Sequence, residues 1–215
     1  MLHTANIITH ISAGLIAMGI GIFIFAKPKG GTGHRQLGRV FLGLMSIVIV
    51  TALAGTLLFI DRPFLTIVTI QSFYFSYSGY RVVQTKAKGF ERVDFGMMIL
   101  VLAIVIWITT QLSAANVLWH SSVVYYLLVY LYLVLGFDML RYAFPKMISH
   151  PRFWLYEHTY KMTSAFGALV SAGMGTVLVA WEPWNQIIPA MSTSFWLIFC
   201  VIYFPRKLQV KIKHR

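Results

Sequence analysis

The sequence predicts an all-α fold, a seven-helix transmembrane bundle that forms one domain over residues 1–215. Composition is the first observation behind this prediction. The chain is 58% hydrophobic and only 11% charged, whereas a soluble domain carries about 25% charged residues. The second observation is a series of apolar runs, each close to the roughly 20 residues that cross a bilayer as a helix. Charged or turn residues separate these runs.

The predicted helices follow one another with short connections. The first, at about 5–26, lacks the basic start and cleavage site of a signal peptide, so we expect it to remain as a helix. Asp61-Arg62-Pro63 separates the second from the third, and Glu182-Pro183 separates the sixth from the seventh. Helices two to seven are predicted at about 37–60, 64–84, 94–113, 121–140, 159–181 and 187–205.

The positions of the charges predict an orientation. The net charge is +12, and all but one of the 18 Lys and Arg residues lie in four clusters, at 27–39, 81–92, 141–161 and 206–215. An excess of basic residues in alternate connections is typical of cytoplasmic loops. We therefore expect the N-terminus outside, the C-terminus in the cytoplasm, and anionic lipid bound at the cytoplasmic face. The same pattern argues against nucleic acid as the partner of these charges.

Ionisable residues at membrane depth are costly, which makes them candidates for function. His34 and His158 each open a predicted helix on the cytoplasmic side, and a face rich in small residues follows each of them. His158 and Met162 are four residues apart and so share one helix face. His10 and His120 form a second pair toward the outer side.

Two imidazoles from different helices can hold a haem iron from opposite sides. The first hypothesis is therefore a haem b protein that transfers electrons, with His34 and His158 as one ligand pair and His10 and His120 as another. Met162 could replace a histidine as a ligand. A membrane redox protein or a quinone would then be its partner.

Two other hypotheses remain open. His34 and His158 with the carboxylates Glu157 and Asp138 could ligate zinc or iron in a membrane hydrolase, although the predicted seventh helix contains no histidine. Asp138 could instead pair with Arg141, three residues along the same helix, and Asp94 could cap its helix. The last hypothesis is a transport, sensory or assembly protein without a metal.

Several short motifs resemble a bacterial multi-pass inner-membrane family, domain of unknown function 2306. They are His10-Ile11 with Gly14, Lys29-Gly30-Gly31, His34-Arg35, Gly38-Arg39, Met45, Gly79-Tyr80-Arg81, and Trp154-Leu155 through His158 to Met162. The resemblance implies a seven-helix protein of the bacterial inner membrane and draws attention to His10, His34 and His158. It implies no particular activity.

Overall fold

The computed structural model describes residues 1–59, 63–115, 122–145 and 153–213. Within these ranges the chain forms α-helices and two short 3₁₀ turns, with no β-strand. The helices are α1 (Leu2–Ala26), α2 (Thr32–Leu58), α3 (Pro63–Thr85), α4 (Arg92–Ala114), α5 (Ser122–Ala143), α6 (Phe153–Val177) and α7 (Trp184–Lys213). The 3₁₀ turns are η1 (Lys86–Lys88) and η4 (Val179–Trp181).

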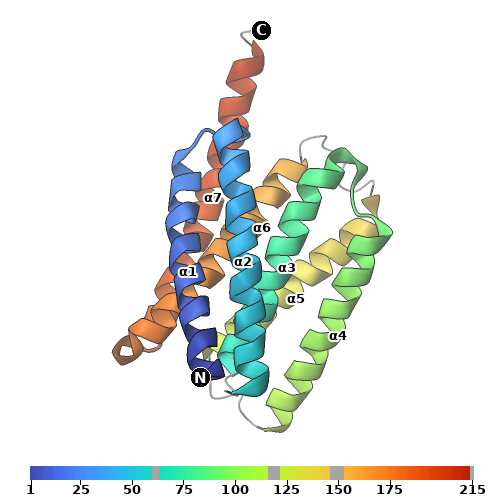
Figure 1. Ribbon diagram of the computed structural model, residues 1–215. Coiled ribbons are helices and arrows are strands. Elements are labelled where there is room, and N and C mark those ends of the chain that lie inside the picture. The colour runs from blue at the N-terminus through green and yellow to red at the C-terminus, as the bar shows by residue number, and fades with distance from the viewer. Residues whose placement is uncertain (60–62, 116–121, 146–152, 214–215) are drawn as a thin grey trace.

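Successive helices run in alternating directions, so the N- and C-terminal ends of the chain lie at opposite ends of the bundle (Figure 1). α3 occupies the centre, where it packs against α2, α4, α5 and α6, while α1 packs against α2 and α6. Buried apolar side chains form two clusters. One joins α3, α4, α5 and α6, and the other joins α1, α2 and α6. α6 is the one helix that contributes buried residues to both.

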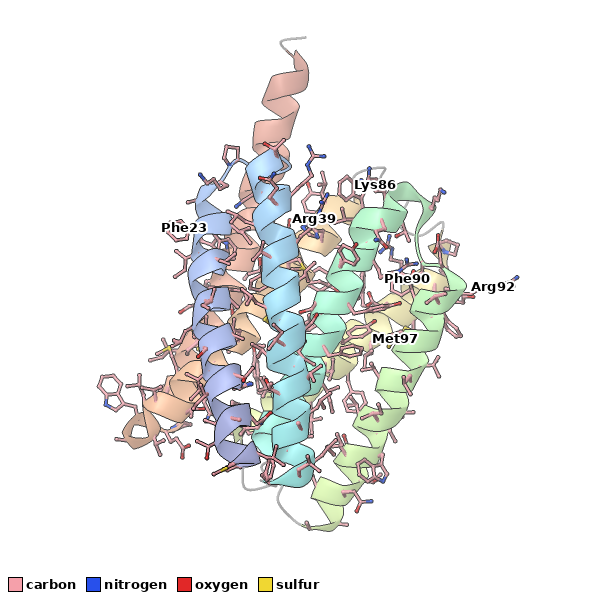
Figure 2. The ribbon with its side chains drawn as sticks, in the orientation of Figure 1. Phe23, Arg39, Lys86, Phe90, Arg92 and Met97 are labelled. Atoms are coloured by element: carbon pink, nitrogen blue, oxygen red, sulfur yellow. The ribbon has the colours of Figure 1, made fainter. Side chains whose placement is uncertain are left out.

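The surface of this bundle exposes many large apolar side chains, unlike the surface of a soluble bundle. Large apolar side chains such as Ile16, Phe23 and Trp107 are more than half exposed, and Figure 2 shows Phe23 pointing away from the bundle on α1. Four helices, α1, α2, α4 and α5, are long and apolar enough to cross a membrane. The chain therefore has the character of a multi-pass membrane protein.

In contrast to the apolar surface, the interior of the bundle contains many polar side chains. Of the helices in the described ranges, α3, α6 and α7 are not among the four apolar ones, and α3 and α6 bury several polar side chains. α3 buries two threonines, a glutamine and three serines, and α6 buries Glu157, Lys161, Thr163 and Ser171. The predicted bounds of α3 match within a residue, but α6 begins at Phe153, six residues before the predicted start. The segment between the predicted fifth and sixth helices, 141–158, is thus partly helix. α7 likewise continues as a helix to Lys213.

Three glycines explain why α6 can lie so close to its neighbours. A Cβ at Gly79 would stand 3.0 Å from Met162 Sδ, one at Gly21 would stand 2.4 Å from the Phe166 ring, and one at Gly167 would stand 2.6 Å from Thr193 Oγ1. In contrast, a Cβ at Gly19, Gly38 or Gly43 would meet no atom within 4 Å. Close packing within this chain therefore does not account for the last three.

Candidate functional site

A fully buried lysine lies at the centre of the polar interior. Lys161 on α6 has an exposed fraction of 0%, as do its partners Asp138 on α5 and Glu157 on α6. Lys161 Nζ donates to Asp138 Oδ2 at 2.8 Å and to Glu157 Oε1 at 2.9 Å. A buried charge is stable only when it is paired and hydrogen-bonded. One ammonium group thus satisfies two carboxylates from different helices.

Further groups close this cluster. Arg141 on α5 forms an ion pair with Glu157, so the cluster holds two acids and two bases and has no net charge. Tyr74 on α3 donates its hydroxyl to Asp138 Oδ2 at 2.5 Å. Phe90 lies beneath both cations, 5.3 Å from Lys161 Nζ and 5.7 Å from the Arg141 guanidinium carbon. We refer to Tyr74, Asp138, Arg141, Glu157 and Lys161 as the Lys161 cluster.

A second ionic group lies where α3 ends and α4 begins. Arg81 on α3 donates through Nε to Asp94 Oδ1 at 2.6 Å and through Nη2 to Glu91 Oε2 at 2.7 Å. Asp94 also accepts the backbone N–H of Glu91 at 3.0 Å, which confirms its predicted role as a cap in the first turn of α4. Asp94 is 6% exposed, whereas the Glu91 side chain is 51% exposed. This group therefore connects the interior to the surface.

The structure brings two of the predicted histidines together. The ring centroids of His34 on α2 and His158 on α6 are 6.5 Å apart, and the ring planes are nearly perpendicular, at 79°. Nδ1 of His158 lies 2.9 Å from the backbone oxygen of Gly79. A carbonyl oxygen only accepts hydrogen bonds, so Nδ1 carries the proton and Nε2 of the neutral ring keeps its lone pair. Nδ1 of His34 has no hydrogen-bond partner among the described residues.

The remaining predicted ligands lie elsewhere or outside the described residues. His10 fits between α1 and α2, where its Nδ1 lies 3.1 Å from Val48 O and 2.9 Å from Thr51 Oγ1. Met162 shares the face of α6 that carries His158, and its sulfur packs against Gly79. His120 falls in a segment that the structure does not describe, so its predicted pairing with His10 stays a prediction.

The carboxylates predicted as metal ligands have other partners. Asp138 and Glu157 meet at Lys161, and the described residues contain no group of three or more His, Cys, Asp or Glu side chains that could hold a metal ion. Arg141, the alternative partner predicted for Asp138, forms its ion pair with Glu157, and Lys161 contacts Asp138. The carboxylates thus neutralise cations in this structure.

Lys161 is the central residue that the sequence analysis missed. Its place in the 141–161 basic cluster assigned it to the cytoplasmic surface, and that assignment is wrong because the side chain is fully buried. One signal was available. Glu157 and Lys161 are four residues apart, the spacing at which a glutamate and a lysine pair on one helix, and Lys161 lies inside the predicted sixth helix.

Comparison with known proteins adds no further identification. No protein family, curated protein or solved structure matches the chain. The functional conclusions therefore depend on the geometry of the chain itself.

Proposed function

We propose that this chain is a multi-pass protein of the bacterial inner membrane that binds haem b between His34 and His158 and transfers electrons. The single observation that supports this proposal is the neighbouring pair of imidazoles from two different helices, whose ring centroids are 6.5 Å apart. A metal–nitrogen bond is roughly 2 Å long, and an imidazole nitrogen lies about 1 Å from its ring centre. Two imidazoles on opposite sides of one metal therefore have centroids about 6 Å apart, close to the observed separation.

The number of ligands favours haem over a bare metal ion. Zinc requires three or four ligands from the protein, and the described residues provide no such group. A haem supplies four nitrogens of its own, so two imidazoles complete the coordination of its iron. The hydrogen bond from His158 Nδ1 to Gly79 would fix the ring with Nε2 as the free ligand atom.

The surroundings of His34 also suit a flat anionic cofactor. Gly38 lies one turn beyond His34, and a Cβ there would meet no atom within 4 Å. No other part of the described chain therefore packs against the helix surface at Gly38. Arg35 and Arg39 flank it and are exposed, so their guanidinium groups are available to pair with propionate carboxylates. With the basic end of the bundle in the cytoplasm, this site would face anionic lipid, and a quinone or a membrane redox protein would exchange electrons with it.

An absorption spectrum of the detergent-purified protein, with haemin added in excess and unbound haemin removed, tests this proposal. We expect a Soret band and the sharp reduced bands of low-spin haem with two imidazole ligands. His34→Ala and His158→Ala should each abolish the low-spin signature. His3→Ala is the matched control, because His3 packs on Phe59 near the opposite end of the bundle. One haem per chain supports a single site, and two would extend the proposal to His10 and His120.

A colourless protein after haemin addition would overturn the haem proposal, as would a spectrum unchanged in both His34→Ala and His158→Ala. Stoichiometric zinc in a colourless protein would instead favour the metal-dependent hydrolase. That alternative has less support, because Asp138 and Glu157 are bound to Lys161 and not to the histidines. Absence of both metal and haem would favour transport or assembly.

A further inference from the structure

A polar stripe runs along the face of α3 that points into the bundle. Its five residues are spaced alternately three and four apart, the spacing that keeps side chains on one helix face. Because an α-helix rises about 1.5 Å per residue, the stripe covers roughly 21 Å of the helix axis. Gln71, Tyr74, Ser78 and Thr85 are at most 7% exposed. The stripe consists of Gln71, Tyr74, Ser78, Arg81 and Thr85.

Most of this stripe borders a small internal cavity. The cavity has a volume of about 10 Å³, and its lining includes Tyr74, Ser78, Arg81 and Thr85 from α3 and Asp94 from α4. A volume of about 10–15 Å³ with two or more polar partners is what one water molecule requires. The cavity is thus at the lower limit for a single water. Apolar surface, including that of Val82 and Phe90, makes up most of its lining, and residues such as Tyr74, Arg81 and Asp94 supply polar groups.

The cavity lies between the two ionic groups of the bundle. At one end, Asp94 and Arg81 connect it to Glu91, which is half exposed. At the other end, the Tyr74 hydroxyl connects it to Asp138 and through Asp138 to Lys161. Asp138 Oδ1 is buried and has no hydrogen-bond partner among the described residues. The cavity therefore lies between an ionic group that reaches the surface and a buried carboxylate with spare acceptor capacity.

We propose that the Lys161 cluster is a proton-loading site, which takes up and releases a proton through this cavity from the Glu91 end of the bundle. The ligand is a proton delivered by water, and Asp138 is the group that receives it. This function is separate from haem binding. It gives a physical reason for a buried lysine that a purely structural bundle would replace with an apolar side chain.

The transfer conserves protons and charge at each step. A water in the cavity gives a proton to the Tyr74 oxygen as the Tyr74 O–H proton passes to Asp138 Oδ2. Asp138 becomes a neutral acid, Tyr74 is restored, and the water, now hydroxide, is reprotonated from the surface. The cluster changes from neutral to a net charge of +1, shared by Lys161 and Arg141. Release follows the same bonds in reverse.

Other titratable groups surround Lys161 and set the cost of the added charge. The titratable groups that interact with Lys161 are Tyr74 on α3, Asp94 on α4, Asp138 and Arg141 on α5, and Glu157 and Tyr160 on α6. Tyr77, Arg81 and Glu91 contact Asp94 in turn. Among these, Asp94 and Glu91 are the anions nearest the surface. Their negative charge offsets a proton that enters from that side.

Infrared difference spectroscopy on the lipid-reconstituted chain tests this proposal. Spectra are recorded between about pH 4 and about pH 10, the range over which free carboxylates and lysine amines titrate. We expect a carboxylic-acid C=O band that appears as pH falls, shifts in heavy water and is absent in Asp138→Asn. Tyr74→Phe should shift the band and slow its appearance after a pH jump by about tenfold or more, because a positioned proton-transfer group is lost. Tyr130→Phe is the matched control, since its buried hydroxyl bonds Ser164 and not the cluster.

The outcomes separate a proton-loading site from a static ion-pair network. No C=O band that depends on Asp138 would overturn the proposal, as would Tyr74→Phe kinetics equal to those of Tyr130→Phe. Tyr74→Phe removes a single oxygen, so it keeps the proposal testable if Asp138→Asn does not fold. The band should persist in His34→Ala, which distinguishes failure of this proposal from failure of haem binding.

Discussion

At the residue scale, the Lys161 cluster depends on equal numbers of acidic and basic side chains in the interior. Taking a charged group out of water costs several kcal/mol in a protein, and four charged side chains come together here in the interior. Each has an opposite charge within contact, and Asp138 has the Tyr74 hydroxyl in addition. Removing one charged member leaves the buried cluster with a net charge, whereas removing Asp138 and Lys161 together leaves the Arg141–Glu157 pair intact.

This equality of acids and bases predicts that the effects of substituting Asp138 and Lys161 on stability are not additive. Lys161→Met should lower the free energy of unfolding by about 3–5 kcal/mol, because it leaves two buried carboxylates with one cation. Asp138→Asn should lower it by less, because Lys161 keeps its contact with Glu157. The double variant should cost less than the sum of the two by about 1–3 kcal/mol, since the Arg141–Glu157 pair remains. Equilibrium unfolding in mixed micelles measures all three.

A control for this cycle is Glu91→Gln, which removes an exposed partner of Arg81. We expect a change of at most about 1 kcal/mol there, because solvent screens surface ion pairs. Additive costs for Asp138→Asn and Lys161→Met would contradict the coupling.

Single residues also show what sequence could and could not predict about the site. The selection of His34 and His158 from their positions at helix ends led to two side chains that the fold places together. The partners of Asp138 and Glu157 were not predictable in the same way. Which cation reaches Asp138 depends on how α5 and α6 rotate about their axes, and hydropathy carries no information about that rotation when both helices are apolar on most sides.

At the element scale, the positions of the helices could be predicted from the sequence, but the burial of polar side chains such as Glu157 could not. The bounds of α3 follow from the apolar run and its flanking charges, and they agree with the prediction. The start of α6 was predicted too late, because Trp154 to His158 has the mixed aromatic and charged composition of an interfacial strip. In the structure the same residues are helical, and Glu157 is buried because Lys161 and Arg141 provide its partners.

The close approach of α6 and α7 predicts the effect of a single methyl group. A Cβ at Gly167 would stand 2.6 Å from Oγ1, 2.7 Å from Cγ2 and 2.9 Å from Cβ of Thr193. No rotamer of a β-branched side chain moves all three atoms away. Gly167→Ala should therefore lower the melting temperature of the purified protein.

Gly43→Ala is the matched control, since a Cβ there would contact nothing within 4 Å. It should leave the melting temperature unchanged or raise it, because alanine favours a helix over glycine by about 1 kcal/mol. A Gly167→Ala protein as stable as Gly43→Ala would show that α7 can move away from α6 without cost.

At the scale of the whole molecule, the ends of the bundle differ in charge. Arg39, Lys86 and Arg92 lie toward the end of the bundle at which the chain finishes, and the N-terminal end of α1 is at the other (Figures 1 and 2). The sequence predicted this separation from the spacing of the basic clusters alone. Seven membrane crossings with the basic end in the cytoplasm remain a prediction, because composition identifies four helices as apolar enough.

Cysteine labelling in intact bacterial cells tests the orientation. In a chain with Cys200→Ser, which removes the single cysteine, we introduce Lys88→Cys at η1 or Ser113→Cys at the far end of α4; both side chains are exposed. A membrane-impermeant maleimide should label Ser113→Cys in intact cells and Lys88→Cys only after lysis, because basic ends stay in the cytoplasm. The reverse result would invert the orientation, and labelling of both in intact cells would contradict opposite-side placement.

The polar face of α3, which points into the bundle, affects how the chain enters the bilayer during synthesis. A charged residue near the centre of a helix costs about 2.5–3.5 kcal/mol at the translocon. Arg81 lies near the end of α3, so the polar part of this helix at membrane depth is its row of buried hydroxyl and amide groups. Asp94 and Asp138, which contact Arg81 and Tyr74, are synthesised only afterwards. We expect the nascent third helix to stay beside the insertion machinery, or beside α2, until these partners are made.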